Sequence, residues 1–333
     1  MKKILALLLA LWIPAAVLSG CAPQDDSAAS NKLNIVTTIF PAYDWVREIL
    51  GAETDRAEIT TLLDSGVDLH SYQPTVDDIV KISECDLFLY VGGESDGWVD
   101  DALKNAPNKD RKVIRLLDVL GDSAKAEETV AGMQEEEHDH EEEEHGHEEE
   151  AEYDEHIWLS LKNAQVLVAA ISEALQESDP ARKDTYAANA AAYAEKLSAL
   201  DGEYRAAVDS GTYKTLLFGD RFPFRYLADD YGLDYYAAFP GCSAETEASF
   251  ETVSFLAGKM DALGLPCVLT IEGTQHKIAE TIVQNTAQKN QQILTMDSMQ
   301  AVTANDASSG VSYLSIMEKN LSVLKKALGQ EAE

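Results

Sequence analysis

The stretch LNIVTTIFPAYDWVREIL, residues 33–50, joins a compact apolar run to a segment with helical spacing. Its first part, Leu33 to Phe40, is rich in β-branched and apolar side chains and predicts a buried strand. In the second part, Trp45, Ile49 and Leu50 recur at the spacing of one helix face. A buried strand followed directly by such a helix is typical of folds in which helices cover a parallel sheet.

The same alternation of strand and helix continues to residue 160. TVDDIVKIS, residues 75–83, predicts a helix between two of the strands. Further strands are predicted at residues 57–63, 86–93 and 112–118. Since parallel strands joined through helices need right-handed crossovers, residues 33–160 are predicted to form an N-terminal α/β lobe.

Residues 161–208 are rich in Ala, Leu, Glu and Lys and contain few helix breakers. Only the group Ser178-Asp179-Pro180 interrupts them, which predicts a first helix, a turn, and then a helix of roughly 25 residues. A helix of that length between two halves of a chain predicts a rigid spine.

Residues 209–330 repeat the strand–helix pattern and predict a C-terminal α/β lobe. The predicted strands are residues 215–219, 233–239, 267–273 and 292–298. The expected fold is therefore α/β, with two similar lobes that contain parallel-type sheets and are joined by a long rigid spine helix. Because ligands of open α/β sheets bind beyond the carboxyl ends of the strands, we expect the site in the interlobe cleft.

Residues 1–20 predict an export signal, because two lysines precede an apolar stretch that is too short to span a membrane. The following sequence LSGC, residues 18–21, resembles the lipobox of bacterial lipoproteins, which implies that Cys21 is lipid-modified. A secreted protein cleaved nearby is the alternative. Residues 21–32 are small and polar and predict a flexible tether. We expect an extracytoplasmic protein, lipid-anchored to the cell membrane.

The formal net charge of −33 excludes a typical nucleic-acid binder, which needs a basic surface. The acidity is uneven, since residues 135–155 contain twelve Glu and two Asp without a basic residue. Without apolar anchors, this loop is expected to be disordered over about residues 124–153.

Four histidines lie within the acidic loop in two His-x-His pairs, which are His138, His140, His145 and His147. This spacing lets two imidazoles reach one ion, and the surrounding carboxylates raise the local concentration of cations. We expect an auxiliary metal-collecting loop. A purely solvated acidic loop is the alternative.

The four cysteines include no Cys-x-x-Cys pair, which argues against a thiolate zinc cluster. Cys242 and Cys267 lie in the same half of the chain and are the expected disulfide outside the cytoplasm. Cys85, in an apolar context, is expected to be a small buried side chain.

Several segments together resemble the metal-binding lipoproteins of ABC importers, the zinc and manganese substrate-binding proteins of cluster A-I. The resemblance covers nearly all of the mature chain, and the His-rich insertion is a feature of the zinc-binding members. Its most specific parts are the His-x-Tyr-x-Pro segment at His70 and the Asp-x-His-x-Trp-Leu-Ser segment at His156. The other matching segments are residues 34–46, 75–93, 226–249 and 294–302.

The resemblance implies that His70 and His156 bind the metal from the first lobe. Family members add a His or Glu from a His-x-Ala-Phe-x-Tyr pattern, but an alignment without a gap places Arg221 there. A guanidinium group cannot bind a cation, so the neighbouring Asp220 is the predicted ligand.

The family's last ligand is an Asp or Glu after the final strand, and Asp297 matches it. The alternative for Asp297 is a helix N-cap or turn residue. His276, which follows a strand, is a further candidate that would compensate for the missing histidine, and Glu272 is another.

The resulting hypothesis is a monomeric substrate-binding protein that captures Zn²⁺ and delivers it to an ABC permease without catalysis. Two histidines with two carboxylates suit Mn²⁺ as well, so a manganese-specific protein of the same family is the first alternative. A secreted metallohydrolase, for which no His-Glu-x-x-His motif is present, and a surface adhesin are the others.

Overall fold

The computed structural model describes residues 32–104, 106–134, 152–243, 247–273 and 276–330. Its first sheet consists of parallel strands in the order β2-β1-β3-β4. These are β1 (Leu33–Thr37), β2 (Ala57–Thr61), β3 (Leu87–Tyr90) and β4 (Lys112–Arg115). Every residue of β3 is buried, as expected for an inner strand of a sheet with both faces covered.

The second sheet repeats this arrangement with parallel strands in the order β6-β5-β7-β8. These are β5 (Thr215–Arg221), β6 (Asp234–Phe239), β7 (Cys267–Thr270) and β8 (Gln292–Thr295). Both sheets thus place their strands in the same order relative to the chain. The prediction of two similar parallel α/β lobes is confirmed.

Several helices begin where the sequence supplies a cap. Thr75 and Asp78 form a capping box at the start of α2, and Ser160 accepts the N–H of Asn163 at the start of α5. Among the described residues, no helix is both long and apolar enough to cross a membrane. The helices outside the spine are α1 (Phe40–Leu50), α2 (Val76–Glu84), α3 (Val99–Lys104), α4 (Leu116–Leu120), α7 (Arg225–Tyr231), α8 (Phe250–Leu263), α9 (Lys277–Asn285), α10 (Ala304–Ser308) and α11 (Tyr313–Ala327).

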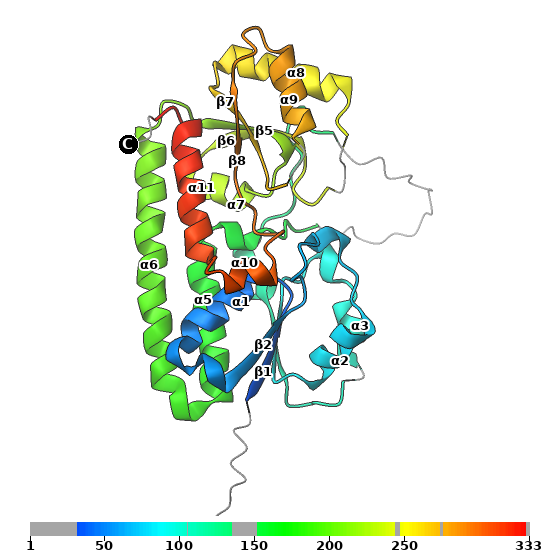
Figure 1. Cartoon of the computed structure of the whole chain (residues 1–333), viewed down its shortest axis with the longest axis vertical. Coiled ribbons are helices and arrows are strands. Elements are labelled where there is room, and N and C mark those ends of the chain that lie inside the picture. The colour runs from blue at the N-terminus through cyan, green and yellow to red at the C-terminus, as the bar shows by residue number, and fades with distance from the viewer. Residues whose placement is uncertain (1–31, 105, 135–151, 244–246, 274–275, 331–333) are drawn as a thin grey trace, which may run out of the picture. The chain divides into compact units, whose positions relative to one another are not determined.

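The spine consists of α5 (Leu161–Ser178) and α6 (Lys183–Ser210), which are separated at Pro180 as predicted. Helix α6 is 28 residues long and packs against α5, α1 and α11. Figure 1 shows α6 in green beside α11 in red. The hydroxyl of Tyr204, which is buried on α6, donates to the carbonyl of Met317 on α11 at 2.7 Å. The long helix is therefore tied to the C-terminal helix by a buried hydrogen bond.

The prediction that disorder begins at about residue 124 is wrong, because residues 124–134 make defined contacts. Ala126 forms an antiparallel bridge with Tyr153, and the N–H of Gln134 donates to the carbonyl of Ala238 at 2.9 Å. A Cβ added at Gly132 would lie 2.1 Å from the Phe255 ring, so the chain passes close to α8. The backbone here is held by β6, a partner that local sequence does not reveal. Residues 135–151 of the acidic loop, including His138, His140, His145 and His147, lie outside the described residues.

A buried carboxyl group joins α1 to the start of α11. The N–H of Tyr313 donates to Asp44 Oδ2 at 2.8 Å, and Asp44 is only 3% exposed. Burial raises the pKa of Asp44 to about 6, and the charge of Glu48 adds to this effect, while the Tyr313 hydrogen bond opposes it. The ionised form of Asp44 is therefore less stable in the folded protein than in the unfolded chain.

We predict that Asp44→Asn stabilises the protein at pH 7.5 but not at pH 4. As pH rises from 4 through 6, the unfolded chain releases the Asp44 proton first, so the wild type loses stability over this range. Asparagine keeps an oxygen for Tyr313 and carries no charge, so the expected gain at pH 7.5 is about 1–2 kcal/mol. Urea unfolding at both pH values measures it. An equal effect at the two pH values would contradict this explanation.

Candidate metal site

His70 lies in a short 3-10 turn (Leu69–Ser71) that follows β2. Asp68 caps this turn, since its Oδ1 accepts the N–H of His70 at 3.0 Å. The Nδ1 atom of the His70 ring lies 2.9 Å from Ser95 Oγ and 3.5 Å from Glu155 Oε2. These contacts at Nδ1 leave Nε2 as the ring nitrogen that is available to bind a ligand.

His156 is fully buried and stands at the start of a second 3-10 turn (Ile157–Leu159). One carboxylate oxygen, Asp154 Oδ1, lies 2.8 Å from the backbone nitrogen of His156 and 3.0 Å from its ring Nδ1. A carboxylate behind Nδ1 fixes the orientation of an imidazole and makes it a better metal ligand through Nε2.

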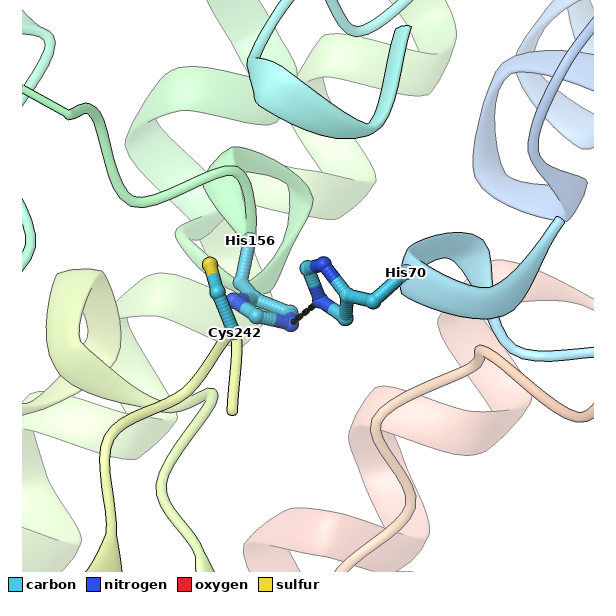
Figure 2. Close-up of side chains that lie close together, drawn as sticks. All are labelled: His70, His156 and Cys242. Carbon is cyan, nitrogen blue, oxygen red and sulfur yellow. Dashed lines mark hydrogen bonds between the residues drawn. The ribbon is translucent and has the colours of Figure 1, made fainter. Parts of the chain in front are cut away.

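The two imidazole rings face each other through their remaining nitrogens (Figure 2). His70 Nε2 and His156 Nε2 are 3.3 Å apart. Burial lowers the pKa of His70 to about 3, and the neighbouring charge of His156 adds to this effect. At neutral pH His70 is therefore the uncharged imidazole that metal ions bind.

A cysteine from the second half of the chain completes a group of three candidate ligands. The ligand atoms of His70, His156 and Cys242 all lie within 4.8 Å of one another. In Figure 2, Cys242 lies next to the His156 ring. Burial raises the pKa of the Cys242 thiol above its ordinary value, and the charge of Asp154 adds to this effect. Without a cation, the group is therefore two imidazoles and a neutral thiol.

The predicted disulfide between Cys242 and Cys267 is absent, because both cysteines are free. Cys267 begins β7, whereas Cys242 follows the end of β6, and β5 lies between these parallel strands. The two cysteines therefore lie at opposite ends of two parallel strands that are not neighbours in the sheet. Cys85 is buried as expected, and its thiol donates to the carbonyl of Ile82 at 3.2 Å. Sequence reasoning missed Cys242 as a candidate ligand, although its place after a strand is where parallel sheets present ligands.

Arg221, at the family's ligand position, instead connects the two halves of the chain. Its Nη2 forms an ion pair with Asp68 Oδ2, two residues before His70, and its Nη1 donates to the carbonyl of Ser243 at 3.3 Å. Burial alone would raise the pKa of Asp68, but the hydrogen bond and charge of Arg221 lower it. The guanidinium group therefore makes an ion pair and a hydrogen bond beside the site.

The two predicted second-lobe carboxylates are not in the group of three. Asp220 accepts the backbone N–H groups of Arg221 at 2.9 Å and Ile271 at 3.3 Å, one on each oxygen. Asp297 Oδ1 accepts the N–H of Met299 at 2.8 Å, which is the contact of a turn residue. Their assignment as ligands stays a prediction.

The other two candidate ligands are Glu272 and His276, and neither is in the group of three. Glu272 accepts the N–H and the hydroxyl of Ser298 and the N–H of Gln300, at 2.6, 2.7 and 3.1 Å. It therefore holds the turn after β8. His276 precedes α9, and its buried Nδ1 has no hydrogen-bond partner within the described part of the chain.

Glycines allow the backbone to approach the site closely. A Cβ added at Gly241 would lie 2.9 Å from the carbonyl oxygen of Phe222 and 3.2 Å from the His156 ring. A Cβ at Gly93 would lie 2.0 Å from Glu155 Oε1, the oxygen that accepts the N–H of Ser95. Gly241 thus lets the segment that carries Cys242 lie directly against His156.

Comparisons with known proteins agree with this architecture. Zinc-binding lipoprotein AdcA of Streptococcus pneumoniae (strain ATCC BAA-334 / TIGR4) is 33% identical over 331 residues, which cover 99% of this chain and 62% of that relative. This chain therefore spans less than two thirds of the relative's length. High-affinity zinc uptake system protein ZnuA of Bacillus subtilis (strain 168) is 30% identical over 90% of this chain and 88% of its own.

A solved structure has the same fold. The Zn(II)-bound ZnuA-like domain of Streptococcus pneumoniae AdcA superposes with a TM-score of 0.68 at 29% identity, covering 90% of this chain and all of that one. The family model described as "Zinc-uptake complex component A periplasmic" matches residues 35–327. Because this match covers most of the chain, the protein belongs to the ZnuA family of zinc-uptake components.

Proposed function

We propose that this protein captures Zn²⁺ outside the cytoplasm and delivers it to an ABC permease. The observation that supports this most directly is the 3.3 Å separation of His70 Nε2 and His156 Nε2. Two imidazole nitrogens that share a tetrahedral zinc ion at 2.0–2.1 Å are about 3.3–3.4 Å apart. The two rings are thus already spaced to hold one Zn²⁺ ion.

The ion is cargo in this proposal, and the protein performs no catalysis on it. The Bacillus subtilis relative is named as part of a high-affinity zinc uptake system, which supports delivery to a permease. The Streptococcus pneumoniae relative is named a lipoprotein, which supports lipid anchoring through Cys21. Residues 1–31 lie outside the described part of the chain.

Zinc is favoured over manganese by the donor atoms near the site. Two imidazoles suit Zn²⁺, whereas Mn²⁺ prefers carboxylate and carbonyl oxygens. In the part of the chain that the structure describes, the group of candidate ligands that contains His70 and His156 includes no carboxylate. Asp297, with one oxygen free of described hydrogen bonds, remains the proposed carboxylate ligand, and His276 remains a further candidate.

We predict that His156→Ala and His70→Ala each lower the affinity for Zn²⁺. Loss of a direct ligand should cost more than the roughly 10–100-fold that loss of a supporting residue costs. Titration calorimetry on residues 22–333 without metal measures it, and circular dichroism verifies folding. Val166→Ala is the comparison variant, because Val166 is exposed on α5 and outside the group of three. Unchanged affinity in a folded His156→Ala protein would refute the site.

We predict that Gly241→Ala weakens Zn²⁺ binding by about tenfold, since the new methyl group would press on the His156 ring. Gly258→Ala is the matched control. Gly258 lies in α8, where an added Cβ has nothing within 4 Å, so alanine there should leave binding unchanged and favour the helix. Equal affinities of the two variants would show that the close approach of Gly241 does not matter.

We predict that deleting residues 135–151, with His138, His140, His145 and His147, leaves one tight Zn²⁺ site. Only weaker sites should disappear, because a loop whose sequence predicts disorder would lose conformational entropy on closing around an ion. Calorimetry of both forms measures the number of sites. Loss of all tight binding on deletion would instead place the main site in the acidic loop.

A further inference from the structure

We infer that Cys242 supplies a thiolate ligand to the captured ion, in the role that the family resemblance gives to a second-lobe His or Glu. This inference rests on the proposed function, since it requires that His70 and His156 bind Zn²⁺. In this site the sulfur of Cys242, which follows β6, takes the place that was predicted from the sequence for the carboxylate of Asp220.

The first argument is distance. The Cys242 sulfur and one ring nitrogen of each histidine lie within 4.8 Å of one another. In a tetrahedral site with Zn–N near 2.0–2.1 Å and Zn–S near 2.3 Å, the nitrogen–sulfur separation is about 3.6 Å. A shift of about 1 Å, within reach of a side-chain rotation, would close the gap from the 4.8 Å limit.

The second argument is the loss of the alternatives at the usual position. Arg221 carries a permanent positive charge and is paired with Asp68. The oxygens of Asp220 both accept backbone N–H groups, from Arg221 and Ile271. These contacts hold Asp220 against the backbone, and among the described residues the group of candidate ligands around His70 and His156 includes Cys242 and not Asp220.

The third argument is that the surroundings of Cys242 are built for a cation. The backbone N–H of Cys242 donates to Glu127 Oε1 at 2.8 Å, which fixes the residue. Asp154, Glu155 and Glu127 surround the sulfur with negative charge, which a divalent ion would compensate.

A bound zinc ion deprotonates a coordinating thiol outright. With the Asp220 carboxylate replaced by a thiolate and Asp297 kept as the proposed carboxylate, the donor set is softer than one with two carboxylates. Soft thiolate ligands select Zn²⁺ and disfavour Mn²⁺. Cys242 therefore acts as a selectivity residue in addition to a ligand.

Cobalt substitution tests the inference directly. A thiolate bound to Co²⁺ gives a strong charge-transfer absorption in the near ultraviolet, which imidazole and carboxylate ligands do not give. Residues 22–333 are titrated with Co²⁺ alone, in wild type, Cys242→Ser and Cys267→Ser. Cys267 is the matched control, because it is a buried free cysteine that begins an inner strand of the same sheet, at the opposite end from the one that Cys242 follows.

We expect the charge-transfer band in wild type and Cys267→Ser and its loss in Cys242→Ser. The Zn²⁺ affinity of Cys242→Ser should fall at least about tenfold. Co²⁺ binding to wild type without the band would overturn the inference and leave the proposed function intact. Failure of wild type to bind either Zn²⁺ or Co²⁺ tightly would overturn both.

A measurement on the wild-type protein keeps the test valid if Cys242→Ser does not fold. Alkylation of Cys242 by iodoacetamide, followed by peptide mass spectrometry, should slow at least about tenfold when Zn²⁺ is added, because a coordinated thiolate is less accessible and less nucleophilic. The alkylation rate of Cys267 serves as the internal reference. An unchanged Cys242 rate with Zn²⁺ bound would overturn the inference.

Discussion

The arrangement of the site depends on how the fully buried His156 ring is held in place. A buried imidazole is costly unless its polar atoms have partners, and Asp154 Oδ1 lies within hydrogen-bond distance of both its backbone and ring nitrogens. Three further hydrogen bonds hold the turn that carries His156. Tyr226 on α7 donates to the carbonyl of Asp154, Tyr313 on α11 to that of Trp158, and the Trp158 indole to that of Ser298. A residue predicted for the first lobe is thus positioned by the second.

This fastening explains why the spine matters for the site. Helix α11, which provides Tyr313, is tied to α6 through Tyr204 and to α1 through Asp44. The backbone N–H of Tyr313 donates to Asp44, and its hydroxyl donates to the carbonyl of Trp158. The His156 turn is therefore linked to the helices of the spine by buried hydrogen bonds.

The sequence was sufficient to predict the fold and two of the three candidate ligands that the structure brings together. Strand–helix alternation identified all the strands of both sheets, although KVIRLLD was predicted as one strand and Leu116 instead begins α4. His70 and His156 were predicted from short motifs that resemble those of a known family, and in each motif an Asp two residues earlier accepts the backbone N–H of the histidine. Cys242 was not predicted as a ligand, because it was paired with Cys267 on their nearness along the chain. Nearness along the chain does not show that the two cysteines are at opposite ends of parallel strands. Contacts such as Gln134 with Ala238 depend on tertiary structure and leave no local signal.

Arg221 and Cys242 are best understood together. A guanidinium group in place of a metal ligand adds positive charge beside the ion, and the structure offsets it with the Asp68 ion pair. A histidine at this position would be a ligand, and a carboxylate elsewhere in the site would balance the charge of the ion. Arg221 instead supplies no ligand and adds a positive charge. A thiolate from Cys242 corrects both in the proposed site, since it supplies a donor and a negative charge at once. Gly241 completes this exchange, because only a residue without Cβ brings the cysteine against His156 without displacing the ring.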